Sequence, residues 1–155
     1  MKKRNIWLGL LILFTIFIFS RSLKSAEESS IESSWIVMMS VKFVKLIFSQ
    51  VPDNINQIMT FFVRKAAHAA EYFVDGCLLC GFFSTFKNKV KGNVPWILFI
   101  GLFTACTDEL LQSFPPGRSP EVRDVFVDFA GIVCALILCV IVSQLKNKKN
   151  VSHKI

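Results

Sequence analysis

The residues best suited to chemistry recur at helical spacing within one apolar run. Arg64, His68, Glu71 and Asp75 are separated by four, three and four residues. A helix would therefore place all four on one narrow stripe. A guanidinium, an imidazole and two carboxylates on one stripe can transfer protons or hold an ion. Because bare charges are costly in a membrane, we expect this stripe to face protein or water.

A second polar face lies at the end of a later apolar run. Thr104, Asp108 and Gln112 recur every four residues, and Glu109 is next to Asp108. The spacing predicts that the first three share one face of a helix. This face would bring an amide and a carboxylate opposite the stripe that carries His68.

A third polar face begins the last apolar run. Asp124 and Asp128 are four residues apart, and Gly131 and Ala135 continue their helical face. Small residues on a helix allow another helix to approach closely. We therefore expect close packing below two carboxylates.

The loop between the last two apolar runs contains basic residues. Pro115, Pro116 and Gly117 end the preceding helix, which leaves Arg118 able to fold back over the polar residues. Arg118 could instead pair with Asp124, and the sequence does not separate these two roles. Arg123 is next to Asp124.

The polar residues form two candidate sets. Groups suited to acid and base catalysis, or to holding a divalent cation, are His68, Glu71, Asp108, Glu109 and Asp124. Groups suited to binding a substrate are Arg64, Lys65, Tyr72, Gln112, Arg118, Arg123 and Asp128. The sequence has no nucleophile elbow, zinc-protease motif or phosphate-binding glycine loop that would specify a reaction. No residue is assigned as a metal ligand at this point.

The composition indicates a membrane protein of one domain over residues 1–155. Hydrophobic residues make up 53% of the chain, and 16 Phe stand against one Tyr. The net charge of +7 falls in short clusters beside apolar runs, which argues against nucleic acid as a partner. All five cysteines lie in apolar runs, so we interpret the pair Cys77 and Cys80 as packing residues.

Four apolar runs predict an all-α integral membrane bundle of four transmembrane helices. They span residues 6–20, 61–86, 94–111 and 125–145. The first run could also be a signal peptide of a soluble protein, but no small-residue cleavage site follows closely. We therefore expect it to be a retained helix.

Basic residues predict the orientation of these helices. Lys and Arg cluster in three segments, at residues 2–4, 87–91 and 146–149. All three segments fall on one side of a four-span arrangement. By the positive-inside rule, both termini are then cytoplasmic and the polar site faces the outer leaflet.

An amphipathic helix is expected outside the membrane over residues 35–50. Trp35, Met39 and Phe43 share an apolar side, and Lys42 and Lys45 lie on another. This helix could lie in the outer interface or cover part of the bundle, and these interpretations overlap. The preceding residues 21–34 are rich in Ser and Glu, which predicts a mobile linker.

Three sequence motifs together resemble the VanZ-like family, named for a teicoplanin resistance protein. They are Arg64-Lys65-x-x-His68-x-x-Glu71-Tyr72, Asp108-Glu109-x-x-Gln112, and Pro116-Gly117-Arg118 followed by Asp124 and Gly131. The resemblance covers essentially the whole chain and implies a protein of the bacterial cytoplasmic membrane that gives low-level resistance to glycopeptide and lipoglycopeptide antibiotics. Asp128 replaces the Asn that the family usually has after the helix-four Asp, and Asp75 is outside the family's pattern.

Three functions fit these observations. In the first, the outer polar site recognises a membrane lipid head group, a lipid-linked wall precursor or the antibiotic itself. In the second, the protein is an intramembrane enzyme that modifies or hydrolyses a lipid-linked substrate, with His and carboxylate acid-base chemistry or a bound divalent cation. In the third, Asp75 belongs to a proton-coupled transporter, which would need an oligomer because four short helices form a small bundle.

Overall fold

The structure is a computed structural model that describes residues 2–48 and 50–152. This part of the chain forms helices and no strands, which confirms the all-α prediction. The α-helices are α1 (Lys2–Ser22), α2 (Ala26–Ile47), α3 (Ile55–Phe83), α4 (Val94–Leu111) and α5 (Val122–Ser152), and a short 3-10 helix, η1 (Lys91–Asn93), precedes α4.

Three segments within the described residues are long and apolar enough to cross a membrane. They are Lys2–Ser22, Lys91–Leu111 and Val122–Lys146. At 29 residues α3 has the length of a span, but it carries the charged stripe predicted from the sequence. The membrane character of the chain is therefore confirmed, and the prediction of four spans is confirmed for three.

The observed helix boundaries match the prediction closely for α4 and less closely elsewhere. The predicted span 94–111 coincides with α4. Helix α3 begins six residues before the predicted start at 61, and α5 continues to Ser152. Position 49, in the predicted helix 35–50, lies outside the described residues.

The predicted linker at residues 21–34 is wrong. Arg21 and Ser22 belong to α1, and α2 begins at Ala26. The reason is a capping box, in which the Ser25 side chain accepts from the Glu28 N–H and the Glu28 side chain accepts from the Ser25 N–H. Both groups satisfy backbone donors that the first turn leaves free, so the polar segment starts a helix.

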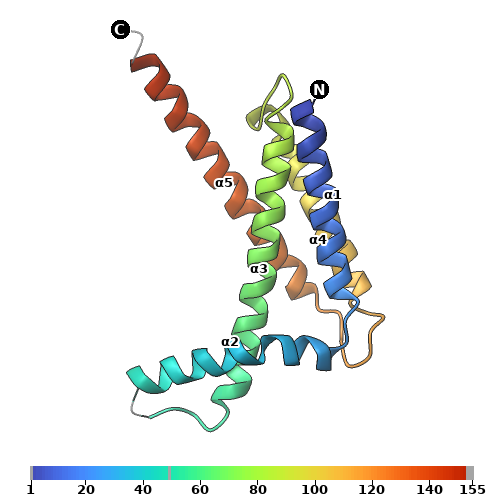
Figure 1. The fold of residues 1–155 in the computed structure, drawn as a ribbon, viewed down its shortest axis with the longest axis vertical. Coiled ribbons are helices and arrows are strands. Elements are labelled where there is room, and N and C mark those ends of the chain that lie inside the picture. The colour runs from blue at the N-terminus through green and yellow to red at the C-terminus, as the bar shows by residue number, and fades with distance from the viewer. Residues whose placement is uncertain (1, 49, 153–155) are drawn as a thin grey trace.

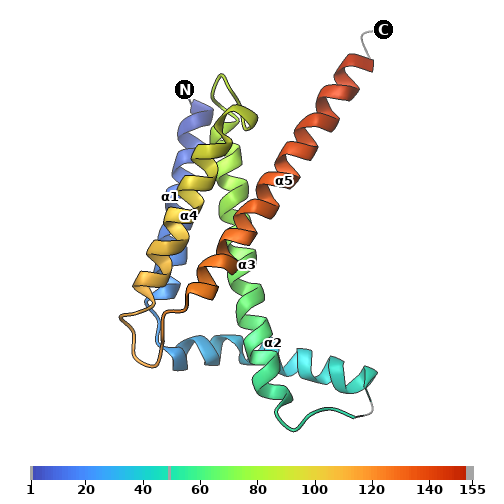
Figure 2. The ribbon, with the colours of Figure 1, turned by 180° about the vertical axis from the view of Figure 1, so that it is seen from behind.

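The long helices are arranged so that the basic clusters share one end (Figure 1). The N-terminus, the loop between α3 and α4, and the C-terminal end of α5 all lie at that end. Helix α2 runs across the other end, where the loop between α4 and α5 also lies (Figure 2). Residue 26 joins these two elements, because its N–H donates to the carbonyl oxygen of Pro116 at 3.3 Å.

Helices α3 and α5 cross closely at small residues. A Cβ atom added to Gly76 would lie 2.7 Å from the Cβ of Ala135, and one added to Gly131 would meet α3. Tyr72, Leu79 and Ile132 are fully buried around this crossing. The predicted close approach below Asp124 and Asp128 is therefore confirmed, and it fixes the distance between the polar residues of α3 and those of α5.

Helix α2 is buried against the bundle on one side and exposed on another. Val37 and Val41 are buried in a small cluster with Ile55, the first residue of α3. Trp35 and Phe43 are more than 60% exposed on another face of α2. One side of the helix thus covers the bundle, and another presents apolar surface of the kind that enters a membrane interface.

Candidate functional site

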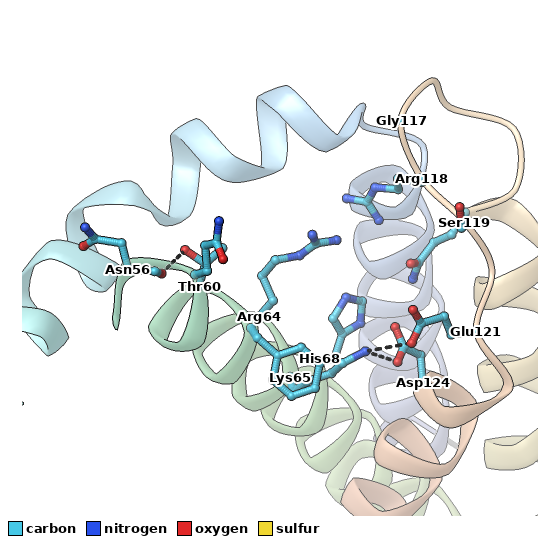
Figure 3. Close-up of a pocket in the computed structure, with 13 residues that line it drawn as sticks. Asn56, Thr60, Arg64, Lys65, His68, Gly117, Arg118, Ser119, Glu121 and Asp124 are labelled. Atoms are coloured by element: carbon cyan, nitrogen blue, oxygen red, sulfur yellow. Dashed lines mark hydrogen bonds and ion pairs between the residues drawn. The ribbon is translucent and has the colours of Figure 1, made fainter. Parts of the chain in front are cut away.

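A cavity lies where α3, the α4–α5 loop and the start of α5 meet (Figure 3). Its volume is about 550 Å³. Predicted site residues in its wall are Arg64, Lys65, His68, Gln112, Arg118 and Asp124. Most of the predicted substrate-binding set thus comes together at this cavity, hereafter the cleft.

Two arginines dominate one wall of the cleft. The Arg64 and Arg118 side chains extend toward each other from α3 and from the loop (Figure 3). Neither has an acidic partner within 4.0 Å among the described residues. The Nε of Arg118 is buried and has no hydrogen-bond partner there. The alternative pairing of Arg118 with Asp124 is therefore not observed.

The surroundings of Arg118 shift the pKa of its guanidinium. Burial lowers the pKa of this guanidinium from its ordinary value, and the nearby positive charge of Arg64 lowers it further. Asp108 and Glu109 act in the opposite direction. An arginine nevertheless remains protonated at physiological pH. The wall therefore carries two positive charges that no carboxylate of the described residues pairs with directly.

In another part of the cleft wall, the positive charge of a lysine is balanced by carboxylates. The Lys65 ammonium pairs with the Asp124 carboxylate and lies 3.9 Å from that of Glu121. This pair joins α3 to α5, and both side chains are largely buried. Lys65 thus lies at the cleft, and its charge is balanced by carboxylates of the protein.

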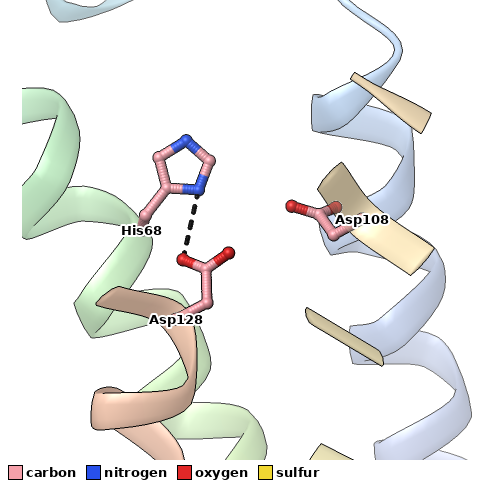
Figure 4. Close-up of side chains that lie close together, drawn as sticks. All are labelled: His68, Asp108 and Asp128. Carbon is pink, nitrogen blue, oxygen red and sulfur yellow. Dashed lines mark ion pairs between the residues drawn. The ribbon is translucent and has the colours of Figure 1, made fainter. Parts of the chain in front are cut away.

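His68 connects the cleft to two buried aspartates (Figure 4). Its Nδ1 is 3.6 Å from Oδ1 of Asp128 on α5. Asp128 is fully buried, and neither of its carboxylate oxygens has a hydrogen-bond partner among the described residues. Asp108 on α4 accepts from the Ser22 hydroxyl and, at 3.0 Å, from Nε2 of Gln112.

This arrangement changes the candidate set for a cation. Ligand atoms of His68, Asp108 and Asp128 all lie within 4.8 Å of one another. Of the predicted set, Glu71 and Asp124 are paired with basic residues, and Glu109 accepts the backbone N–H of Glu121. Asp128, predicted to bind a substrate, lies instead beside the imidazole.

Glu71 lies on a second cavity of about 240 Å³, on the side of α1 and α2. Its carboxylate is 3.0 Å from the Arg21 guanidinium, which is also 3.0 Å from that of Glu32. Arg64 and Arg118 contribute to the walls of both cavities. The arginine wall therefore separates two polar spaces.

Three other residues of interest lie away from the cleft. Tyr72 is buried, and its hydroxyl donates to the Thr104 carbonyl oxygen at 3.3 Å. Arg123 has an 82% exposed side chain that pairs with Glu121 at 3.2 Å. Asp75 is buried deeper along α3. Of the predicted substrate-binding residues, the cleft wall contains Arg64, Lys65, Gln112 and Arg118, and does not contain Tyr72, Arg123 or Asp128.

Sequence reasoning missed several polar residues of the cleft. They include Asn56 and Thr60 on the first turns of α3, and Ser119 and Glu121 in the α4–α5 loop. Asn56 and Thr60 continue the four-residue spacing of Arg64 and His68, so the signal was present. Arg21 was also missed, although it lies at the predicted outer end of the first helix.

The arrangement can bind an anion at the arginine wall and move a proton or hold a cation at His68. Guanidinium groups form charge-assisted bonds to phosphate or carboxylate oxygens. An imidazole beside two carboxylates is suited to proton transfer or cation binding. These two capacities adjoin each other at the cleft.

Comparison with known proteins gives one match. The family described as VanZ/LLP1 matches residues 6–143, which includes every motif discussed above. No curated protein and no solved structure matches the chain.

Proposed function

Because the chain belongs to the VanZ/LLP1 family, we propose that it confers low-level resistance to glycopeptide and lipoglycopeptide antibiotics by recognising the phosphate of a membrane lipid or a lipid-linked wall precursor. The observation that carries this proposal is the wall formed by Arg64 and Arg118. Both arginines face one cleft, and neither has an acidic partner within 4.0 Å among the described residues.

The rest of the cleft suits a phosphorylated head group. Its side-chain amides and hydroxyls come from Asn56, Gln57, Thr60, Gln112 and Ser119. A volume of about 550 Å³ is in the range of small-molecule sites. Two adjacent guanidinium groups can share the oxygens of a phosphate or pyrophosphate, while neutral donors orient what is attached to it.

The charge distribution supports an outward-facing site. We propose that α3 is a fourth span, because two of its charged side chains have partners on neighbouring helices: Glu71 pairs with Arg21 of α1, and Lys65 with Asp124 of α5. The basic clusters lie at one end of the bundle, which we assign to the cytoplasm with both termini. The cleft and α2 lie at the other end, which is then the outer leaflet, where wall precursors meet these antibiotics.

Binding by purified protein tests the proposal. In nanodiscs, wild-type protein is expected to bind a short-chain polyprenyl pyrophosphate or phosphatidylglycerol. Arg64→Ala and Arg118→Ala should weaken binding at least tenfold, since a hydrogen bond to a charged group contributes about 1.5–3 kcal/mol. The matched control is Arg123→Ala, whose exposed side chain lies outside the cleft.

Resistance in cells provides the second readout. Arg118→Ala should lower the teicoplanin concentration that cells withstand to that of cells without the protein, whereas Arg123→Ala should not. Full protection by an Arg118→Ala protein at wild-type abundance would overturn the proposal. Binding of teicoplanin but of neither phospholipid would assign the cleft to the antibiotic instead.

A lipid-modifying enzyme is the second candidate function. The favouring observation is that His68 lines the cleft with its Nδ1 3.6 Å from an Asp128 carboxylate, so the imidazole is able to accept or donate a proton beside a bound head group. Release of inorganic phosphate from the polyprenyl pyrophosphate, lost in His68→Gln, would support this function. Binding without any product would oppose it.

A further inference from the structure

The side chains of His68, Asp108 and Asp128 come together from three helices (Figure 4). His68 also lines the cleft. From this convergence we infer that they bind one first-row divalent cation, of the Mn²⁺ or Zn²⁺ type, at the junction of α3, α4 and α5. The inference does not depend on what the cleft recognises.

The first argument is the state of Asp128. Its exposed fraction is 0%, and both of its oxygens lack a hydrogen-bond partner among the described residues. A buried carboxylate without a partner loses its hydrogen bonds to water and forms no other interaction that compensates for this cost. A cation bound between the helices supplies the missing partner to both oxygens.

The second argument is distance. His68 Nδ1 and Asp128 Oδ1 are 3.6 Å apart, which is too long for a hydrogen bond. Two ligands of a tetrahedral ion with bonds of about 2.1 Å lie about 3.4 Å apart. Nδ1 of His68 is also buried and has no hydrogen-bond partner within the described part of the chain. An oxygen of the Asp108 carboxylate lies within 4.8 Å of the ligand atoms of both groups and completes the set.

The third argument is the support around Asp108. The Ser22 hydroxyl donates to Oδ1 and the Gln112 amide to Oδ2. Each oxygen keeps a further lone pair, which leaves the carboxylate able to coordinate an ion. Neighbours that orient a ligand in this way are a regular feature of metal sites. Ser22 and Gln112 are therefore positioning residues for the cation.

The donor set selects the kind of ion. One imidazole nitrogen with carboxylate oxygens suits Mn²⁺ or Zn²⁺ better than Ca²⁺ or Mg²⁺, which favour oxygen ligands alone. Three protein ligands also leave a coordination position open. His68 lines the cleft, so the open position is near the space where we propose that a head group binds.

Metal binding by purified full-length protein tests the inference directly. After treatment with a chelator and dialysis, the protein in detergent is titrated with Mn²⁺, Zn²⁺ or Mg²⁺, and bound metal is counted by elemental analysis. We expect one Mn²⁺ or Zn²⁺ per chain and binding of Mg²⁺ at least tenfold weaker. Asp128→Asn and His68→Gln should each weaken binding at least 100-fold, and Ser22→Ala about 10- to 100-fold.

Asp75→Asn is the matched control. Asp75 is also a buried acid, one oxygen of which has no hydrogen-bond partner among the residues that the structure describes, but it lies outside the cluster. The Asp75→Asn variant should bind metal as tightly as the wild type. Added metal should raise the melting temperature of the wild type and of Asp75→Asn, and leave that of Asp128→Asn unchanged. If Asp128→Asn cannot be purified, His68→Gln takes its place.

Three outcomes would overturn the inference. They are wild-type protein that binds no Mn²⁺ or Zn²⁺, a His68→Gln variant that binds as tightly as the wild type, and equal loss in Asp75→Asn. The first would mean that a proton or a buried water satisfies Asp128. Metal binding that survives in Arg118→Ala, while head-group binding is lost, would separate this site from the proposed function.

Discussion

Gly131 on α5 lies so close to Ala69 on α3 that a Cβ atom at position 131 would be 2.5 Å from the Ala69 carbonyl oxygen. The obstacle is backbone, so one helix would have to move. The crossing lies one turn below Asp128 on α5 and one residue beyond His68 on α3. The separation of these two functional candidates is thus set by a glycine.

We predict that Gly131→Ala destabilises the protein by about 1–3 kcal/mol, because overpacking a tight contact forces a backbone shift. Unfolding in detergent micelles, followed by circular dichroism, provides the measurement. The control is Gly9→Ala, where an added Cβ has no neighbour within 4 Å. That change should be neutral or stabilise by up to about 1 kcal/mol. Equal stabilities of the two variants would contradict the close crossing.

The pair between Lys65 and Asp124 also holds α3 against α5. The two side chains are only 21% and 15% exposed. Removing one partner leaves a largely buried charge, so Lys65→Met should cost about 3 kcal/mol of unfolding free energy. The exposed pair of Arg123 and Glu121 is the comparison, and Arg123→Ala should cost less than about 1 kcal/mol. A double-mutant cycle with Asp124→Asn should show coupling between Lys65 and Asp124.

The capping box of α2 predicts a local effect of mutation. Ser25→Ala removes the acceptor for the Glu28 N–H, so the first turn of α2 should fray while the bundle stays folded. Hydrogen exchange at residues 26–30 should accelerate, and exchange in α4 should not. Ser34→Ala is the control, since its hydroxyl donates only to the Ile31 carbonyl oxygen of the same helix.

Acid should have the same local effect. The backbone N–H and the hydroxyl of Ser25 donate to Glu28 and hold the pKa of this carboxyl below its ordinary value of 4.5. The folded pKa is the lower one, so the stabilisation is present above pH 4.5 and is lost as the pH falls through the folded pKa. Nuclear magnetic resonance of the Ser25 amide should show this transition in the wild type and not in Glu28→Gln. A transition in both proteins would assign it to another group.

Periodicity predicted well what depends on a single helix. The stripe of Arg64, His68 and Glu71 and the extent of α4 follow from spacing along the chain, and the structure contains both. The small residues after Asp128 indicated a close crossing in the same way. The linker prediction failed because Ser and Glu were interpreted only as polar composition. Ser25 and Glu28 also have the three-residue spacing of a capping box, which starts a helix.

Partnerships between helices were harder to predict. The sequence predicts that Glu71, Asp108, Asp124 and Asp128 lie at similar depths in the membrane. It does not predict which residue lies opposite each of them. In the structure Glu71 pairs with Arg21, and Asp124 pairs with Lys65. These choices depend on how far apart the helices lie and how they are rotated, and only tertiary packing fixes those quantities. Arg64 and Arg118, which have no acidic partner within residues 2–48 and 50–152, could therefore be identified only once the partners of the acids were known.

The ion pairs of α3 affect how this helix is inserted into the membrane during synthesis. In the proposed four-span arrangement, α3 is the helix least suited to entering a bilayer alone, since Lys65 and Glu71 would each carry a bare charge. Arg21 is synthesised before α3 and is ready to neutralise Glu71, but Asp124 emerges from the ribosome about 60 residues after Lys65. Until α5 is made, Glu71 has its ion-pair partner on α1, whereas Lys65 still lacks Asp124. The stable insertion of α3 is completed only when the last helix arrives, so truncation before α5 should expose the chain to membrane quality control.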